Sequence, residues 1–269
     1  MLFVYTIIYK KTKIIYNVHK RTGPKRTFSE KEPSPIRKMG PKRTGPNVPK
    51  RTFRKRRKEK MKTQKITLKS KIDNLELECL LTIPDTEIKG IIQLAHGMNE
   101  HKERYTKFIE YLAQNGYVCI INDHRGHGKS IKNQEDLGYF YDSKAEAVIE
   151  DLYQITEYIK EKFPNKKIIL FGHSMGSMIV RKYIAKYDDK IDGLIVCGSP
   201  SENKAAKLGL VLIKIAELFK GEKYRSKTLK KLMFGGFGKK NERTNSWICT
   251  NKEVVEKYNK DELCIYDYT

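Results

Sequence analysis

The sequence predicts an α/β fold built on a mostly parallel sheet with helices on both faces. Two observations predict it. Continuously apolar runs, which read as strands buried on both faces, recur at 89–97, 117–123, 166–172 and 191–200. Segments with helical apolar spacing separate these runs, at 104–114, at 143–162 and from about 177 to 187. Buried strands that alternate with helices are the pattern of a parallel sheet covered on both faces.

Local patterns support the individual elements. Residues 65–70 and 75–83 have the appearance of an antiparallel strand pair ahead of the first buried strand. The segment 143–162 carries one apolar face, and Pro164 follows it as a stop signal. We therefore expect the core of the fold to occupy residues 61–200.

The stretch 201–269 departs from this alternation and predicts a helical lid or cap segment inserted above the sheet. One helix is expected within "KAAKLGLVLIKIAELF" and a shorter one within "KTLKKLMF". The first helix has an apolar stripe formed by Leu208, Leu212, Ile215 and Phe219. Such a stripe favours packing against neighbouring elements, with the lining of a lipid pocket as the second interpretation.

The leader, residues 1–60, differs in composition from the rest. It holds 20 of the 55 Lys and Arg but only 3 of the 32 Asp and Glu. "KRTGPKRTF" at 20–28 returns as "KRTGPNVPKRTF" at 42–53, without apolar periodicity, so the leader is predicted to be disordered over 17–60. It is either an arm for nucleic acid or an anionic membrane, or upstream sequence preceding a start at Met61. We favour the second, and nucleic acid is not an expected partner.

Cysteine and histidine spacing predicts neither a metal site nor a cofactor. The five cysteines are scattered, odd in number and free of CxxC spacing, which favours a reduced, cytoplasmic setting. A metal interpretation of His96, His101, His124 and His127 is not favoured, because their spacing is not that of a helical HExxH motif and no carboxylate-rich segment follows. The opening "MLFVYTIIY" is too short to span a bilayer.

The motif with the clearest chemistry is Gly-x-Ser-x-Gly at 172–176, centred on Ser174. An apolar strand precedes it and a helix follows, which is the context that this motif requires. A side chain at Gly172 or Gly176 would collide with the neighbouring strand or helix. The tight turn lifts the serine hydroxyl off the sheet, and the helix N-terminus directs backbone N–H groups toward developing negative charge.

Three stretches in order, "HGMNEHKERY" (96–105), "DHRGHGKS" (123–130) and "GHSMGS" (172–177), resemble the monoacylglycerol lipase/lysophospholipase family of α/β-hydrolases. The resemblance runs from about Met61 to the end of the chain. It implies that Ser174 is the nucleophile and that the backbone N–H groups of Met98 and Met175 form the oxyanion hole.

The same resemblance implies supporting roles for other polar residues. His96 matches a loop histidine that orients the oxyanion turn, while Asp123 and Arg125 hold loops together by hydrogen bonds.

The resemblance also implies a triad acid and base that this chain does not supply. In the family, Asp and His follow the lid on two further strands, whereas every histidine here precedes Ser174. We expect these last two strands to be missing, and we do not assign Asp261 or Asp267 as the triad acid. Without those strands, 191–197 is expected to be an exposed apolar sheet edge. Residues 61–269 alone are expected to be poorly soluble and inactive.

The sequence thus predicts a cytoplasmic serine hydrolase for lipid-like carboxylic esters, of acylglycerol or lysophospholipid type, with peripheral contact to an anionic membrane as an option. Two alternatives stay open: an inactive truncated fragment or pseudoenzyme, and a non-catalytic acyl-binding protein with a basic arm. No cofactor is expected.

Overall fold

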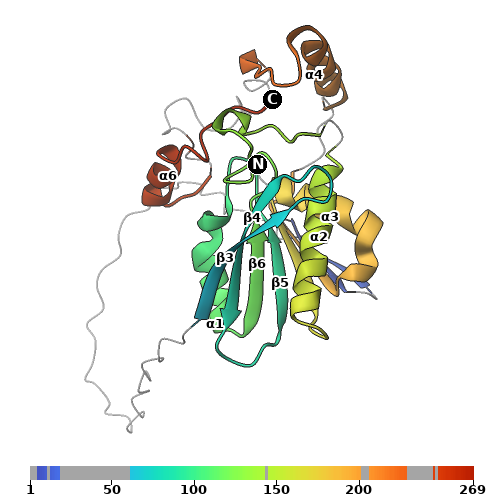
Figure 1. Ribbon diagram of the computed structural model, residues 1–269, viewed down its shortest axis with the longest axis vertical. Coiled ribbons are helices and arrows are strands. Elements are labelled where there is room, and N and C mark those ends of the chain that lie inside the picture. Colours follow the sequence, from blue (N-terminus) through green and yellow to red (C-terminus); the bar gives the residue numbers. More distant parts are fainter. Residues whose placement is uncertain are drawn as a thin grey trace, which may run out of the picture.

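The structure is a computed structural model that describes residues 61–142, 145–200, 206–228, 245 and 248–269, together with the backbone of 5–10 and 13–18. Figure 1 shows a central sheet with helices on both sides. Over the described residues the sheet has eight strands in the order β2-β1-β8-β7-β5-β6-β4-β3. The mostly parallel α/β fold predicted from the sequence is confirmed.

The four central strands are parallel. They are β5 (Gly90–Ala95), β6 (Tyr117–Asn122), β7 (Ile168–His173) and β8 (Gly193–Cys197). The pair β3 (Met61–Lys69) and β4 (Glu76–Pro84) extends the sheet in antiparallel fashion beside β6. Strands β5 and β7 are neighbours in the sheet. The chain continues from β5 to β6 on one side and from β7 to β8 on the other, so the strand order reverses direction between β5 and β7. Ligands bind at such a switch point in open α/β sheets.

Three helices cover the two faces of the sheet (Figure 1): α1 (Thr106–Gln114), α2 (Ala147–Lys162) and α3 (Met175–Tyr187). The apolar faces of α2 and α3 bury Leu152 and Val180 in the larger core cluster, whereas α1 buries Ile109 in the cluster on the other face. Helix α2 begins at Ala147 rather than at 143, and residues 143–144 lie outside the described residues.

The region predicted as a lid, 201–269, contains α4 (Ala206–Lys220) and α6 (Lys252–Asn259) among the described residues. Helix α4 lies apart from the sheet (Figure 1), and the stripe predicted to pack on neighbours is open: Leu212, Ile215 and Phe219 are 40%, 49% and 76% exposed. That packing prediction is wrong for these three residues, because no described element covers them. The side chain of Leu208 and most of the second predicted helix lie outside the described residues.

Part of the leader forms structure, which corrects two predictions. Strands β1 (Tyr5–Lys10) and β2 (Lys13–Val18) form an antiparallel hairpin, and Ile7–Lys10 pairs with Gly193–Val196 of β8. The predicted disorder therefore does not hold for 17–18, and β8 is not an exposed edge. The reason is that an edge strand offers unpaired N–H and C=O groups, and the β-branched run in β1 suits such pairing. Residues 19–60 lie outside the described residues.

Within the described residues, no helix combines the length and the apolar content needed to cross a bilayer.

Candidate active site

Ser174 occupies a strained turn at the end of β7, directly before α3. Its backbone angles are φ 52° and ψ −116°, in the positive-φ region that residues with a side chain rarely adopt. The turn is fixed by the Ser174 N–H, which donates to the Cys197 carbonyl at 2.9 Å, and by the Ser177 N–H, which donates to the Ser174 carbonyl at 2.9 Å. Ser174 is only half-buried, so this turn presents a hydroxyl at the rim of the sheet.

The two glycines of the motif allow helix and sheet to approach closely. A Cβ atom at Gly176 would lie 2.2 Å from the carbonyl oxygen of Ala95 at the end of β5. A Cβ atom at Gly172 would lie 2.5 Å from the carbonyl oxygen of Gly176. Both separations are far shorter than van der Waals contact, so the predicted collisions are confirmed. Only glycine lets α3 start so close to β5.

The loop after β5 lies against Ser174. Ala95 is paired in register with Gly172, so the chain leaves both strands at the same edge of the sheet. A Cβ atom at Gly97 would lie 3.2 Å from the Cβ atom of Ser174. The backbone that carries the Met98 N–H is thus adjacent to the serine, and Met175 supplies the first amide of α3. The first amides of a helix have no partner within the helix and point toward negative charge.

His96 holds this loop in place. Its Nδ1–H donates to the Gly97 carbonyl at 2.8 Å, and its Nε2 accepts from the His124 N–H at 3.0 Å. The ring therefore connects the loop after β5 to the loop after β6, which is the contact pattern of an orienting residue. Burial lowers the pKa of His96 well below its ordinary value, which keeps the ring neutral.

An open pocket of about 290 Å³ lies beside the turn, lined by Glu100, Arg104, Tyr105, Phe108, Phe171 and His173. The Tyr105 hydroxyl donates to Glu100 Oε2 at 2.7 Å and accepts from His173 Nδ1–H at 2.9 Å. Although burial opposes the charge on Glu100, hydrogen bonds from His173, Tyr105 and the Gly97 N–H lower its pKa. Glu100 and Tyr105 were not predicted as site residues, although both lie in the stretch 96–105 that carries the resemblance.

His173 contacts Tyr105 and Glu100 through its Nδ1, and no hydrogen bond among the described residues joins its ring to the Ser174 hydroxyl. The other described histidines are also engaged elsewhere or deeply buried. His127 donates from Nδ1 to the Arg125 carbonyl at 3.0 Å and accepts at Nε2 from the Tyr268 hydroxyl. Burial lowers the pKa of His124 to about 3 and that of His127 to about 4. Among the described residues, no histidine ring is hydrogen-bonded to the Ser174 hydroxyl.

Asp123 and Arg125 hold loops together, as predicted. Asp123 is fully buried and accepts from the Lys102 N–H at 2.7 Å, from Lys102 Nζ at 2.6 Å and from the Lys129 N–H at 2.8 Å. The buried guanidinium of Arg125 donates to Asp151 at 2.7 Å and also contacts Asp73 at 3.2 Å. Buried charges are tolerated only when they are paired, and these pairs join the loop after β6 to its neighbours.

A further pair, absent from the sequence analysis, joins His101 to the turn after α6. Asp261 Oδ2 accepts from His101 Nε2 at 2.8 Å, and Glu103 Oε2 accepts from His101 Nδ1 at 2.9 Å. Burial opposes a charge on His101, but hydrogen bonds with Cys264, Glu103 and Asp261 raise its pKa to about 10. The 160 residues between His101 and Asp261 explain why no local spacing indicated this contact.

Comparisons with known proteins support the family and the fold. Residues 86–269 match the family Hydrolase_4, described as serine aminopeptidase, S33. A monoacylglycerol lipase from Mycolicibacterium smegmatis is 31% identical over 50% of this chain and 46% of its own length. The monoglyceride lipase of Rattus norvegicus is 25% identical over 71% of this chain and 57% of its own length. The chain thus spans about half the length of these curated relatives.

Solved structures show the same architecture. A thermostable carboxyl esterase from Bacillus coagulans in complex with glycerol aligns with a TM-score of 0.70 and 26% identity, over 77% of this chain and 67% of its own. A soluble variant of monoglyceride lipase from Saccharomyces cerevisiae aligns with a TM-score of 0.56 and 18% identity, over 75% and 62% of the two chains, which supports the fold alone. The α/β-hydrolase fold implied by the motifs is confirmed.

The contact between α3 and β5 is tested by substitution of a glycine. Gly176→Ala is expected to lower the free energy of unfolding by about 3 kcal/mol, because the methyl group must displace the backbone of Ala95. Gly209→Ala in α4 is the matched control, since nothing lies within 4 Å of its Cβ position. It is expected to stabilise by about 0.5–1 kcal/mol. Urea unfolding measures both, and a Gly176→Ala protein as stable as the wild type contradicts this packing.

Stability is expected to be greatest near pH 6.5. The pKa values of His96, His124 and His127 are lower in the folded protein than in the unfolded chain. As pH falls from 6.5 toward 3, the unfolded chain therefore takes up protons at these histidines before the folded protein does, and the free energy of unfolding decreases. The pKa of His101 is raised to about 10, so its contribution is complete below pH 6.5 and is lost as pH rises through 10. Each such histidine gives a slope of about 1.4 kcal/mol per pH unit.

Urea unfolding from pH 4.5 to 9 separates the two effects. His101→Asn is expected to flatten the decline above pH 6.5 and to leave the decline below pH 6.5 in place. A variant that still loses stability between pH 7 and 9 as the wild type does would show that His101 is not held as a cation.

Proposed function

Because the chain belongs to the Hydrolase_4 family (serine aminopeptidase, S33), we propose that it carries the nucleophile of a serine hydrolase for carboxylic esters of acylglycerol or lysophospholipid type. The observation that carries this proposal is Ser174 on a strained strand-to-helix turn, with the loop of Gly97 directly against it. A positive φ in a non-glycine residue costs free energy, and strained backbone of this kind concentrates at active sites.

The proposed reaction follows from this arrangement. The proposed base, supplied by residues other than those described, takes the Ser174 hydroxyl proton as the serine oxygen attacks the ester carbonyl, and the N–H groups of Met98 and Met175 stabilise the negative charge on the tetrahedral intermediate. The protonated base then gives this proton to the leaving oxygen, so that the alcohol departs and an acyl-enzyme remains. Water, deprotonated by the same base, hydrolyses the acyl-enzyme and restores Ser174. His96 contributes by fixing the Gly97 carbonyl, which keeps the adjacent Met98 N–H oriented toward the serine.

Lipid-like substrates are supported by two observations. The curated relatives include monoacylglycerol and monoglyceride lipases, and the pocket beside Ser174 combines Phe108 and Phe171 with polar groups. The exposed apolar residues of α4 suit contact with lipid, and they are Leu210, Val211, Leu212, Ile213, Ile215, Leu218 and Phe219. We propose that α4 is the lid of the site and that it contacts acyl chains or an anionic membrane surface.

The triad acid and base remain predictions. Among the described residues, no histidine ring is hydrogen-bonded to Ser174: four of the rings are hydrogen-bonded to other groups, and the ring of His124 is buried. Asp261 is paired with His101. We therefore propose that the base comes from residues other than those described. The same observation, that no described histidine is hydrogen-bonded to Ser174, would also suit the alternative of a non-catalytic acyl-binding protein.

Monoacylglycerol hydrolysis tests the proposal. The 269-residue chain is expected to hydrolyse a monoacylglycerol no faster than Ser174→Ala, because no described histidine is hydrogen-bonded to the Ser174 hydroxyl and a serine without its base loses about 10⁴ in turnover. A longer chain, extended along the reading frame so that it includes one strand followed by Asp and another followed by His, is expected to turn over the ester about 10⁴-fold faster. Mass spectrometry after fluorophosphonate treatment should then find the label on Ser174.

Ser177→Ala is the matched control in the extended chain. The Ser177 hydroxyl is buried and donates to the Ser174 carbonyl, so this variant keeps the nucleophile and is expected to retain labelling. Activity that persists in Ser174→Ala would exclude Ser174 as nucleophile. Ser174-dependent turnover at about 1 s⁻¹ or more by the 269-residue chain would show that the base lies within it. An extended chain that binds fatty acid but hydrolyses no ester would favour the acyl-binding alternative.

A further inference from the structure

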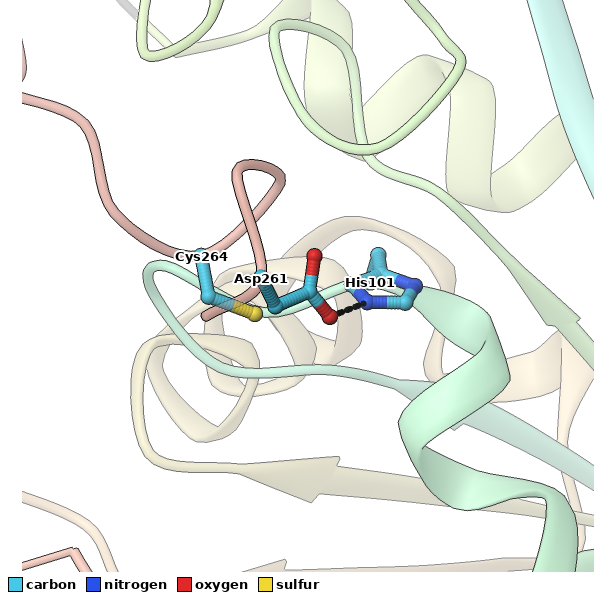
Figure 2. A group of neighbouring side chains, drawn as sticks. All are labelled: His101, Asp261 and Cys264. Carbon is cyan, nitrogen blue, oxygen red and sulfur yellow. Dashed lines mark hydrogen bonds and ion pairs between the residues drawn. The ribbon is translucent and has the colours of Figure 1, made fainter. Parts of the chain in front are cut away.

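Three side chains with metal-binding atoms meet beside the candidate active site. They are His101, from the loop after β5, and Asp261 and Cys264, from the turn after α6, as Figure 2 shows. One ligand atom from each lies within 4.8 Å of the other two. His101 and Cys264 are 7% and 1% exposed, and Asp261 is half-buried.

The imidazole of His101 is oriented as metal-binding histidines are. Its Nδ1 donates to Glu103 Oε2 at 2.9 Å, which directs Nε2 toward Asp261 Oδ2 at 2.8 Å. A metal-ligating histidine commonly donates its other ring N–H to a carboxylate, which fixes the ring and raises the basicity of the ligating nitrogen. Glu103 would fill that supporting role here.

The turn after α6 presents Asp261 and Cys264 together. The Cys264 N–H donates to the Asp261 carbonyl at 2.8 Å, which closes the turn, and the Tyr258 hydroxyl donates to the Cys264 carbonyl at 3.4 Å. Asp261 Oδ1 accepts the Leu263 N–H at 3.0 Å, so Oδ2 is the oxygen turned toward His101. In Figure 2 the sulfur of Cys264 points toward Asp261. The backbone thus holds one oxygen and one sulfur on the side of the imidazole.

We propose that His101 Nε2, Asp261 Oδ2 and Cys264 Sγ bind a divalent metal ion of borderline softness, and that zinc is the ion they suit best. Zinc accepts nitrogen, sulfur and carboxylate oxygen in tetrahedral sites, and three protein ligands leave a fourth position for water. Binding replaces the Nε2 proton of His101 and the thiol proton of Cys264, and both protons leave to solvent. The ligand set is mixed and contains a thiolate, which disfavours magnesium and calcium.

The other group of candidate ligands near His101 is not suited to a metal. It consists of His101, Glu103 and Asp123. Asp123 accepts from Lys102 Nζ at 2.6 Å and Glu103 lies 3.3 Å from the same ammonium group, which is fully buried. A lysine cation already occupies the position of a metal ion between these carboxylates. On the Nε2 side of His101 the partners are instead Asp261 and Cys264.

The proposed ion would fasten the turn after α6 to the loop that contacts Ser174. His101 follows Gly97 by four residues, and Glu100 between them accepts the Gly97 N–H at 3.0 Å. This proposal does not rest on ester hydrolysis, and it goes beyond that function because it assigns a second site to the lid side of the molecule.

Metal titration of the full chain tests the site. Metal-free protein is titrated with Zn²⁺ by calorimetry and with Co²⁺ by absorption spectroscopy, because cobalt bound to a thiolate gives a charge-transfer band in the near ultraviolet. One equivalent of each ion is expected to bind, with that band present. Cys264→Ser is expected to abolish the band and to weaken zinc binding at least about 10-fold. Cys249→Ser is the control, since this half-buried cysteine lies outside the cluster.

Two further variants separate ligation from loss of structure. Asp261→Asn is expected to weaken zinc binding and to keep the cobalt–thiolate band. Glu103→Gln is expected to weaken binding about 10-fold through the orientation of His101. Circular dichroism of each metal-free variant checks that it is folded. Absence of the cobalt band in folded wild-type protein, or equal zinc affinity in Cys264→Ser and wild type, would overturn the proposal, as would loss of the band in Cys249→Ser.

Discussion

The close approach of α3 to β5 is the constraint on which the candidate site depends. The start of α3 lies so near the end of β5 that a single methyl group on Gly176 would overlap the Ala95 carbonyl. This approach leaves one residue, Ser174, to turn the chain from strand to helix, and that residue takes a positive φ. The register of β5 with β7 then brings Gly97 against Ser174. The close approach of α3 to β5 therefore accounts for the strained backbone of Ser174, for the glycines on either side of it and for its contact with the loop of Gly97.

Buried polar groups fix the loops that surround this turn. The stretches 96–105 and 123–130 carry many polar residues. The second is buried except at Lys129, and the first is buried or half-buried, which is costly unless each buried polar group is paired. Asp123 with Lys102, and His96 with the His124 N–H, provide such pairs between the two loops. Removal of one partner would leave a buried charge or donor without compensation, so the loops are held by the same groups that make them polar.

The sequence predicted those features that depend on neighbours along the chain. The buried strands, the turn at Ser174 and the collisions at Gly172 and Gly176 follow from apolar runs and glycine spacing, and the structure confirms them. The exposure of α4 was not predicted, because an apolar stripe indicates a face but not what covers it. The pairing of β1 with β8 was not predicted either, because the interpretation of the leader rested on its charge and its repeats rather than on the apolar run at its start.

The contact of His101 with Asp261 and Cys264 could not be predicted from spacing along the chain. The fold brings this histidine to a turn 160 residues away. The loop 96–105 consequently has two anchored ends: Gly97 beside Ser174, and His101 beside Asp261. Tyr268 adds a third contact through its hydroxyl, which accepts the Asn99 N–H at 2.9 Å. These three contacts fix the position of the loop that carries the proposed Met98 N–H donor on both sides of Met98.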